Sequence, residues 1–377
     1  KPIRALHVLG GLDVGGAESR IMDIYREIDR NKVQFDFLVH TEKKGFFEKE
    51  ITELGGRIYT VPKFGFKNFF SYLNVWKEFF RNHPEYKIVH GHMLSTAFIY
   101  QRIAKKYNVP IRIAHSRCGS RKKISFEDVV KEIFKRLVKF YVTDQFAVSE
   151  IAGRSAFGSR NIRNGKVRVL PNAIKSDKYK FNEELRKKIR KEMNLDDKFV
   201  IGHIGRFNKQ KNHKFLIEIF NEIQKKKPES ILLLVGDGEL REDVENQVKE
   251  LGLSKKVVFA GVRSDVPNLL QAMDVLLFPS FFEGFPGVVL ECQAAGLPCI
   301  ISDTITREVN ITGLVEYVSL KKPAEYWAEK VIQFKDIYVR KDTSEKIVAA
   351  GYDIKSVAKW YENFYIDVMG RRVNGNE

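Results

Sequence analysis

Cysteine and long apolar runs are the features that this 377-residue chain has least of. Its three cysteines, Cys118, Cys292 and Cys299, are odd in number and lack the spacing of a zinc site or a disulfide framework. No segment reaches the roughly 18 uncharged apolar residues that a membrane-spanning helix needs, and the first residues show no charged, apolar and small leader pattern. These absences predict a protein of the cytosol whose cysteines serve in packing.

The net charge of +17 is unevenly distributed along the chain. Residues 101–170 hold 17 Lys and Arg against 5 Asp and Glu, which indicates an anionic partner near one half of the molecule. Nucleic acid, anionic lipid headgroups and phosphorylated small molecules all fit this charge, and charge alone does not choose among them. A basic face that only keeps the protein soluble is a further interpretation.

Strand and helix patterns alternate in two series along the chain. The first opens with an apolar strand, a glycine-rich turn and a helix in residues 3–28, and the second runs from "KFVIGHIGRF" (198–207) to "PCIISD" (298–303). This alternation is typical of parallel sheets covered on both faces, so we expect an α/β protein with two doubly wound, Rossmann-like domains. Ligands of such sheets bind beyond the carboxyl ends of the strands, which predicts a site in a cleft between facing domains.

The boundary between the two series is a polar, lysine-rich segment at 172–198, which we expect to be the linker. The predicted N-terminal domain is therefore residues 1–173, and the predicted C-terminal domain is residues 174–353. The last helical pattern, residues 354–369, has apolar residues at helical spacing and needs a surface to cover. We expect it to pack back on the N-terminal domain.

One apolar stretch, "PSFFEGFPGVVLECQAAGLPCIISD" at 279–303, carries two carboxylates eight residues apart, Glu283 and Glu291. A helix is predicted to begin at Pro286 or Gly287, because proline is favoured at a first helical position. Glu283 then lies in the loop after a buried strand, and Glu291 lies in the early turns of the helix. The free N–H groups of such a helix start bind phosphate. The helix dipole accounts for one nearby carboxylate and leaves Glu283 unexplained.

Two further motifs are "GRFNKQKN" at 205–212, which follows a predicted strand, and "GGAE" at 15–18. Together with the spacing of Glu283 and Glu291, they resemble family 4 of the retaining glycosyltransferases, which have the two-domain GT-B fold. The resemblance extends over nearly the whole chain. The segments "VGDGEL" and "SFFEGFPGVVLE" are most similar to enzymes of bacterial capsular and exopolysaccharide synthesis.

Arg206 and Lys211 are expected at the sheet edge, where they can neutralise a pyrophosphate whose charge grows as the glycosidic bond breaks. The resemblance implies that Glu291 accepts the ribose hydroxyls of the nucleotide and that Glu283 contacts the donor sugar. Carboxylates only accept hydrogen bonds, which suits both roles. His115, at a strand end, is similar to a family histidine that faces the donor sugar. The expected catalytic residues are thus Glu283, His115, Arg206 and Lys211. The expected donor-binding residues are Gly15, Gly16, Gly205, Arg206, Lys211, Val262, Arg263, Glu283, Phe285, Gly287, Val288 and Glu291.

For the acceptor, the resemblance implies Glu18, and we expect His92 to join it from the edge of the cleft or else to have a structural role. His90 and His92 lie two apart on a predicted strand and could suggest a metal, but no third ligand at supporting spacing is near them in the sequence. No D-x-D sequence occurs in the chain either. We therefore expect no metal site, with arginine, lysine and a helix start replacing the metal clamp of other glycosyltransferases.

Two segments, 63–83 and 121–140, combine aromatic and basic residues at helical spacing. In the first, Trp76 and Phe80 lie on one helical side with lysines and an arginine around it. This combination favours the headgroup region of an anionic bilayer. Each segment could equally be a core helix with a solvated rim, and the uneven charge favours membrane contact.

The resulting hypothesis is a retaining, metal-independent glycosyltransferase with no cofactor beyond its nucleotide-sugar donor. It moves a sugar, from a UDP-sugar, to a lipid-linked or free saccharide on the cytoplasmic face of a bacterial membrane, where it is peripheral. Two alternatives stay open: a sugar-nucleotide epimerase or phosphorylase on the same scaffold, and a basic nucleic-acid-binding protein. The chain shows no recognition motif for nucleic acid, so we expect no such partner.

Overall fold

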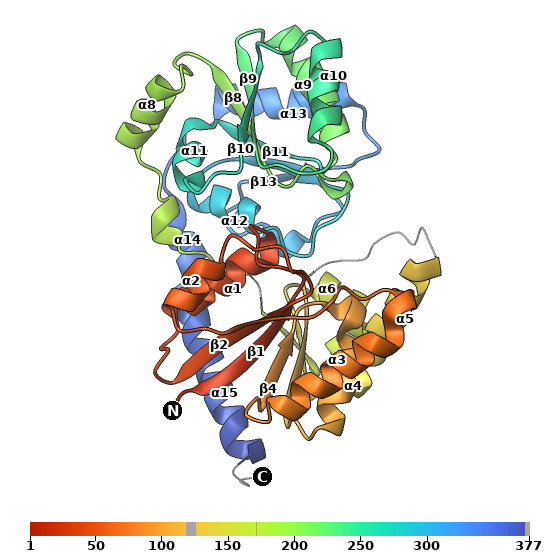
Figure 1. Ribbon diagram of the computed structural model, residues 1–377. Coiled ribbons are helices and arrows are strands. Elements are labelled where there is room, and N and C mark those ends of the chain that lie inside the picture. The colour runs from red at the N-terminus through yellow and green to blue at the C-terminus, as the bar shows by residue number, and fades with distance from the viewer. Residues whose placement is uncertain (118–125, 171, 374–377) are drawn as a thin grey trace. The chain divides into compact units, whose positions relative to one another are not determined.

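The computed structural model describes residues 1–117, 126–170 and 172–373. The chain divides into two compact units, Lys1–Ala173 with Ile354–Glu377, and Ile174–Asp353. Each unit is built on its own parallel sheet (Figure 1). Cys118 and the start of the predicted membrane segment 121–140 lie outside the described residues.

The first unit holds a seven-stranded parallel sheet in the order β3-β2-β1-β4-β5-β6-β7. Its strands are β1 (Ile3–Leu9), β2 (Val33–Val39), β3 (Ile58–Thr60), β4 (Ile88–Gly91), β5 (Ile111–Ser116), β6 (Asp144–Ala147) and β7 (Val167–Val169). Its described helices are α1 (Gly16–Glu27), α2 (Glu48–Glu53), η1 (Phe66–Asn68), α3 (Phe69–Asn82), α4 (Leu94–Lys106), α5 (Phe126–Leu137), η2 (Val138–Phe140), α6 (Glu150–Phe157), α7 (Ser159–Arg163) and α15 (Ile354–Val373). The strand order reverses between β1 and β4. Open α/β sheets bind ligands at such a reversal, beyond the carboxyl ends of the strands.

Helices α1 and α15 share one hydrophobic core on a face of this sheet (Figure 1). The sequence predicts one apolar side for α1 and the residue after it, and all four residues of this side are buried: Ile21, Ile24, Tyr25 and Ile28. Helix α15 comes from the far end of the chain and buries Tyr361, Phe364 and Tyr365 in the same core. Burying an aromatic or aliphatic side chain contributes roughly 1.5–3 kcal/mol. This packing makes α15 part of the first unit.

The side of helix α3 that carries Trp76 and Phe80, which was predicted to contact a membrane or a core, packs in the core. Trp76 and Phe80 are 0% and 3% exposed, and the Trp76 ring stacks on Tyr100 of α4 with centroids 4.9 Å apart. The membrane interpretation of this side is therefore wrong, because the aromatic residues bury their area against neighbouring helices. No helix among the described residues is both long enough and apolar enough to cross a bilayer.

The second unit holds a six-stranded parallel sheet in the order β10-β9-β8-β11-β12-β13. Its strands are β8 (Phe199–Ile204), β9 (Ser230–Val235), β10 (Val257–Gly261), β11 (Val275–Phe278), β12 (Cys299–Ser302) and β13 (Val315–Val318). Its helices are η3 (Ser176–Tyr179), α8 (Glu183–Glu192), η4 (Lys209–Lys211), α9 (His213–Lys226), α10 (Arg241–Glu250), α11 (Val266–Ala272), α12 (Gly287–Ala294), η5 (Arg307–Val309), α13 (Ala324–Ile337) and α14 (Ser344–Ala349). Here the strand order reverses between β8 and β11.

The segment predicted to be a linker, 172–198, instead contributes helix α8 to the second unit. Arg186 and Arg190 of α8 donate to the backbone oxygens of Gln271 and Ala272, at 2.8 and 2.7 Å. Both arginines also pair with Asp274. The prediction failed because arginines that cap a neighbouring helix look, in sequence, like solvated charges. Strand β13 was also not recognised, because Glu316 interrupts its short apolar pattern.

Candidate active site

The carboxyl ends of β8 and β11 bring together two residues that are 72 positions apart. Lys211, in the η4 turn after β8, donates from Nζ to Oε1 of Glu283, in the loop after β11, at 2.7 Å. The two side chains are only 16% and 11% exposed. The Lys211 ammonium also lies 4.4 Å from the ring centre of Phe278. A charge-assisted pair thus occupies the strand-order reversal, where the physics of open parallel sheets places a ligand.

The loop that follows β8 is shaped around Lys211. A Cβ at Gly205 would lie 2.9 Å from Lys211 Cε, so glycine leaves room for the lysine stem. Asn208 Oδ1 accepts from the Lys211 backbone N–H at 3.2 Å. Asn212 adopts a left-handed φ of 58° and donates from Nδ2 to Pro279 O at 3.1 Å. The motif "GRFNKQKN" therefore holds one lysine in a defined place.

Gln210 joins this loop to the one that carries Glu283. The Phe281 backbone N–H donates to Gln210 O at 2.9 Å, and Gln210 Nε2 donates to Phe282 O at 2.9 Å. The contact between Lys211 and Glu283 thus rests on backbone ties as well as on two side chains. Gln210 was not predicted from the sequence, because Phe282, to which its side chain donates, lies 72 residues away and no local pattern indicates the contact.

Arg206 directly follows β8 at the same edge of the sheet. Its side chain is exposed, and no hydrogen bond or ion pair to it is found within the described residues. The neighbouring turn is closed by the Asn208 backbone N–H, which donates to Arg206 O at 2.8 Å. The guanidinium is therefore available to an anion.

Helix α12 begins at Gly287 with Pro286 as its N-cap, which confirms the predicted helix start. The N–H groups of Gly287 and Val288 have no acceptor within the helix, because first-turn donors never do. Glu291 lies about one turn further along and is 6% exposed. This side of the sheet edge thus combines free donors with a nearly buried carboxylate.

Three other predicted donor-site residues differ in how far they can reach a ligand. Phe285 is 4% exposed, and its ring stacks on Tyr352 with centroids 5.5 Å apart, so it packs the loop before α12. Val262, after β10, is 59% exposed. Arg263 pairs with Asp265 at 2.6 Å, and this contact lowers the pKa of the Asp265 carboxyl. The Arg263 guanidinium is therefore already engaged.

In the first unit, the predicted glycine-rich loop leads into α1. The helix begins at Gly16, with Gly15 as an extended N-cap (φ −146°, ψ 163°) and Glu18 in the first turn. A Cβ at Gly16 would meet no atom within 4 Å. The fold itself does not require glycine at position 16, and the space in front of this helix start is open.

Four buried histidines lie near the carboxyl edge of the same sheet. His7 on β1 is paired in register with His90 on β4, His92 follows β4, and His115 lies on β5. His115, predicted to face the donor sugar, is 0% exposed, and its ring stacks on His90 with centroids 5.4 Å apart. Burial lowers the pKa of all four rings, that of His7 to about 3. All four are therefore neutral at pH 7.

The prediction that His90 and His92 have no third metal ligand nearby is wrong in the folded protein. His7 comes from another strand and brings ligand atoms of the three rings within 4.8 Å of one another. His7 Nδ1 and His92 Nε2 already share a hydrogen bond of 3.0 Å, and Arg117 Nε donates to His92 Nδ1 at 3.3 Å. A dication would stand beside this permanent positive charge, which electrostatics disfavours. We therefore assign the cluster to hydrogen bonding.

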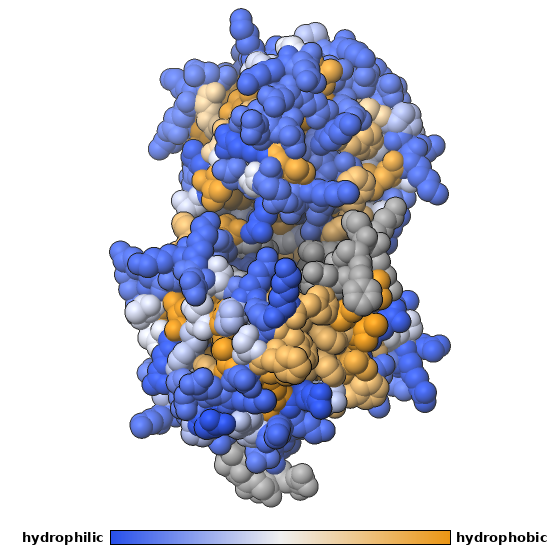
Figure 2. Space-filling model, turned by 45° about the vertical axis from the view of Figure 1, so that its right-hand side comes forward, coloured by the Kyte–Doolittle hydropathy of each residue, from blue (hydrophilic) through white to orange (hydrophobic). Residues whose placement is uncertain are grey.

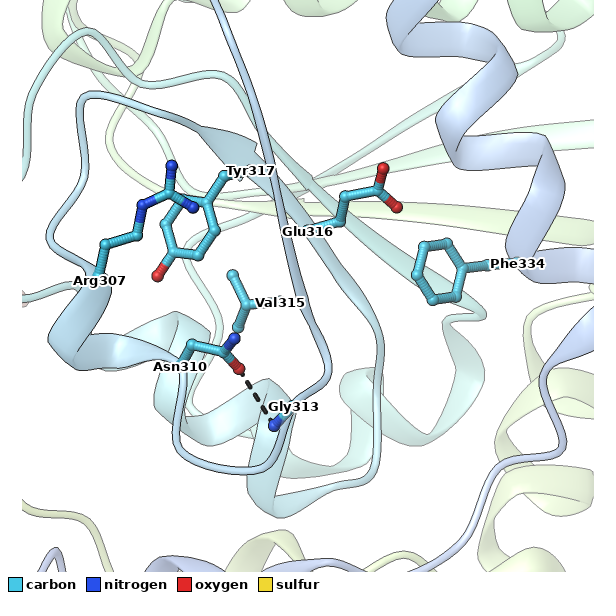
Figure 3. A pocket seen from close by; sticks show the side chains of 7 residues that line it. All are labelled: Arg307, Asn310, Gly313, Val315, Glu316, Tyr317 and Phe334. Atoms are coloured by element: carbon cyan, nitrogen blue, oxygen red, sulfur yellow. Dashed lines mark hydrogen bonds between the residues drawn. The ribbon is translucent and has the colours of Figure 1, made fainter.

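A pocket of about 540 Å³ lies elsewhere in the second unit, at the amino end of β13 (Figure 3). The Arg307 guanidinium lies 3.8 Å from the ring centre of Tyr317, and Glu316 is paired with Lys330 at 2.7 Å. None of the predicted site residues lines this pocket. Because ligands of parallel sheets bind at the opposite, carboxyl ends, its size does not make it the active site.

Family models match both units of the chain. The model described as Glycosyltransferase Family 4 matches residues 14–178, and the model described as Glycosyl transferases group 1 matches residues 185–353. Together these matches contain every predicted site residue. They do not distinguish donors or acceptors.

Several relatives are named as bacterial glycosyltransferases. The chain is 35% identical over 333 residues to a Bacillus subtilis (strain 168) protein named as the glycosyltransferase EpsF, covering 87% of this chain and 86% of that one. It is 34% identical over 236 residues, 58% of each chain, to the Escherichia coli UDP-Gal:alpha-D-GlcNAc-diphosphoundecaprenol alpha-1,3-galactosyltransferase. It is 25% identical over 315 residues to the Staphylococcus aureus capsular polysaccharide biosynthesis glycosyltransferase CapH, covering 81% and 82%.

A solved structure shares the fold. Anabaena Alr3699/HepE in complex with UDP-glucose matches with a TM-score of 0.72 and 18% identity over 98% of both chains. At this identity the likeness establishes the fold alone. Two parallel Rossmann-like sheets, two matching family models and a 35% identical relative matched over most of its length lead to one conclusion. The chain is a glycosyltransferase with the GT-B fold and belongs to glycosyltransferase family 4.

Proposed function

We propose that this glycosyltransferase moves a sugar from a UDP-sugar to a lipid-linked or free saccharide in capsular or exopolysaccharide synthesis, with retention of the anomeric configuration. One observation carries the donor half of this proposal. The Lys211–Glu283 pair, 2.7 Å apart, stands at the strand-order reversal of the second unit beside the exposed Arg206. The Arg206 guanidinium and the Lys211 ammonium offer two cations at this edge, which suits a nucleotide diphosphate.

The departing diphosphate gains negative charge as the glycosidic bond breaks, and positive groups already in place stabilise that charge. Lys211 is held over Gly205 and against Phe278, so little rotamer freedom is lost when it meets a phosphate. Arg206 can add a second, bidentate contact. The free N–H groups at the start of α12 supply further donors. We propose that these groups take the place of a metal ion and that no further cofactor is needed.

The two glutamates are proposed to bind different parts of the donor. Glu291, 6% exposed on α12, accepts hydrogen bonds from the ribose hydroxyls. Glu283 lies in the loop before α12 and contacts Lys211, which supports a role at the diphosphate and the sugar attached to it. In the first unit, we propose that His115 contacts the donor sugar and that Gly15 and Gly16 approach the diphosphate. Glu18 and His92 are proposed to bind the acceptor.

The relatives support the proposed substrate classes. The Escherichia coli enzyme, by its name, uses UDP-Gal and an acceptor linked to diphosphoundecaprenol. The Anabaena protein holds UDP-glucose. We therefore propose a UDP-sugar as the donor substrate and a lipid-linked saccharide as the acceptor substrate of this chain.

A lipid-linked acceptor requires contact with a membrane, and we propose that the first unit binds the cytoplasmic face of the bacterial membrane peripherally. The Phe64 ring contacts those of Phe66 (5.7 Å between centroids) and Phe134 (6.3 Å), so η1 and α5 form one apolar surface. Phe66 and Phe70 are 38% and 79% exposed. Figure 2 shows apolar residues gathered over a continuous area of this unit. Lys67 and other exposed basic residues adjoin it and suit anionic headgroups.

The function is tested with the purified chain and a panel of UDP-, GDP-, ADP- and TDP-sugars. A ligand that binds the native state raises its Tm, so a thermal-shift screen identifies the nucleotide. We expect UDP-sugars to raise Tm and to support transfer in excess EDTA, with the product keeping the anomeric configuration of the donor. Stabilisation by another nucleotide alone would contradict the UDP-sugar donor. Strict dependence on magnesium or manganese would contradict the metal-independent mechanism, and an inverted product would contradict retention.

A further inference from the structure

A chain of hydrogen bonds in the first unit runs from helix α15 to strands β4 and β5. The Tyr365 hydroxyl lies 2.6 Å from His90 Nδ1, and His90 Nε2 lies 3.2 Å from His115 Nδ1. The Tyr361 hydroxyl, one turn earlier on α15, lies 3.5 Å from the same His115 Nδ1. All four side chains are at most 3% exposed, so bulk water does not compete for these bonds.

The two tyrosines set the direction of this chain. Within the described residues, neither hydroxyl has a hydrogen-bond partner other than these histidines. If the histidines donated to the tyrosines, both hydroxyl protons would be buried without an acceptor, which is costly. The Tyr365 hydroxyl therefore donates to His90 Nδ1, and the Tyr361 hydroxyl shares the single lone pair of His115 Nδ1 with His90 Nε2. Burial also raises the pKa of Tyr361 to about 12 and raises that of Tyr365 well above its ordinary value, so both keep their protons at neutral pH.

The protonation state of each ring then follows from its neighbour. Because His90 Nδ1 accepts from Tyr365, the neutral His90 ring carries its proton on Nε2. His90 Nε2–H donates to His115 Nδ1, so His115 in turn carries its proton on Nε2. His115 Nε2 is buried and has no partner among the described residues. This chain of hydrogen bonds thus ends near the carboxyl edge of β5, at the His115 Nε2–H group, which lacks an acceptor.

A second chain beside it has the same polarity. Arg117 Nε can only donate, and it donates to His92 Nδ1 at 3.3 Å. His92 Nε2–H then donates to His7 Nδ1 at 3.0 Å, which leaves the proton of His7 on Nε2. That nitrogen is also buried without a partner in the described part of the chain. Two independent chains therefore end in donors, which calls for a ligand with acceptor oxygens.

We propose that Tyr365, acting through His90, is a positioning residue that fixes His115 as the Nε2–H tautomer, so that His115 donates a hydrogen bond to a hydroxyl or phosphate oxygen of the substrate. The identity of that oxygen rests on the proposed function, whereas the tautomer does not. A protonated ring nitrogen cannot accept, so the bonded group must be an oxygen acceptor. The C-terminal helix thereby acts on the site without touching the substrate.

The tautomers can be read from the ring nitrogen resonances of protein labelled with 15N-histidine, because protonated and bare nitrogens resonate far apart. The variants His90→Gln and His115→Asn assign the peaks. In the wild-type protein we expect both rings to show a protonated Nε2 and a bare Nδ1. A His115 ring protonated at Nδ1 would overturn the proposal, with no need for any variant to fold.

Tyr365→Phe tests the positioning role, because it removes only the hydroxyl. Tyr25→Phe is the matched control: Tyr25 is equally buried against this sheet, but its hydroxyl donates to Leu54 O. We expect Tyr365→Phe to change the His90 and His115 resonances and to lower kcat about two- to tenfold with a smaller change in KM, as the loss of one oriented neutral hydrogen bond implies. The control should do neither. Unchanged resonances or unchanged kcat would overturn the role. Failure of the wild-type protein to transfer any sugar would contradict the proposed function instead, and the resonances would still decide the tautomer.

Discussion

Lys211 is held from three sides: by the Glu283 carboxylate at 2.7 Å, by the Phe278 ring at 4.4 Å, and across the bare Cα of Gly205. Side chains ordered in this way pay little additional entropy when a ligand arrives. Arg206 differs, since it is exposed and free to move toward a phosphate. We therefore expect the two cations to offer one fixed and one adaptable contact to a bound diphosphate.

This arrangement predicts that both cations are needed for transfer. We expect Lys211→Ala and Arg206→Ala each to lower kcat about 100- to 1,000-fold, the loss measured when one preorganised charge stabiliser is removed. Lys209→Ala is the matched control, because Lys209 is exposed in the same η4 turn. Steady-state kinetics with circular dichroism as a fold check measure the effect. Wild-type rates in either variant would remove that residue from the site.

Substitutions of the two glutamates are predicted to affect UDP affinity differently. Glu291→Gln should weaken UDP binding by about 1.5–3 kcal/mol, because a charge-assisted hydrogen bond to the ribose is lost. Glu283→Gln should keep UDP affinity, since it releases the positive charge of Lys211, and should depress turnover instead. Calorimetric titration of both variants with UDP, beside their rates, gives the answer. Equal loss of UDP affinity would place both carboxylates at the same end of the donor.

At the scale of elements, the loop after β8 is as important as the lysine that it carries. Gly205→Ala places a Cβ 2.9 Å from Lys211 Cε and 3.1 Å from Cδ, so the flexible lysine stem must shift. We expect kcat to fall at least about tenfold, since each 1.4 kcal/mol of lost transition-state stabilisation is a factor of ten. Tm should change little. Gly370→Ala on α15, where a Cβ meets nothing within 4 Å, is the control and should keep full activity. Full activity of Gly205→Ala would show that the lysine position is not critical.

The apolar surface of η1, the start of α3 and α5 predicts binding to anionic membranes. Phe70, 79% exposed, can be changed to serine without loss of core packing. We expect the wild-type chain to sediment with vesicles containing phosphatidylglycerol, and Phe70→Ser to sediment several-fold less. Phe46→Ser is a control, because Phe46 is 62% exposed in the loop before α2. Equal retention on heparin and on vesicles, unaffected by Phe70→Ser, would contradict membrane binding through this surface.

At the scale of the whole molecule, buried histidines couple stability to pH. Burial is the main cause that lowers their pKa in both units, for His7, His90, His92, His115, His203 and His213. Below pH 6.5 the folded chain therefore binds fewer protons than the unfolded chain, and the free energy of unfolding falls toward acid pH. Each histidine contributes at most about 1.4 kcal/mol per pH unit until its folded pKa is reached. Calorimetry should show a clearly lower Tm at pH 5.5 than at pH 7.5. An equal Tm would mean that these rings are protonated in the fold.

Much of the fold could be predicted from local pattern. Alternating strands and helices indicated two doubly wound sheets, and the start of α12 followed from Pro286 and Gly287. Predictions failed where the signal was not local. Helix α8 looked like a linker, because the acceptors of Arg186 lie 85 and 87 residues away. Trp76 was ambiguous, because one helical stripe can cover either a core or a membrane.

The sequence by itself determined the family, the residue types of the site and the strand ends at which Lys211, Glu283 and His115 stand. Only the tertiary structure decided which of them meet. The order of strands brings Lys211 to Glu283 across 72 residues, and the packing of α15 on the first sheet brings Tyr365 to His90 across 275. The physical reason is that a local pattern specifies burial and direction but not which strands are neighbours or which sheet a helix covers. The tautomer that we propose for His115 depends on such a contact, because it is set by a tyrosine from the other end of the chain.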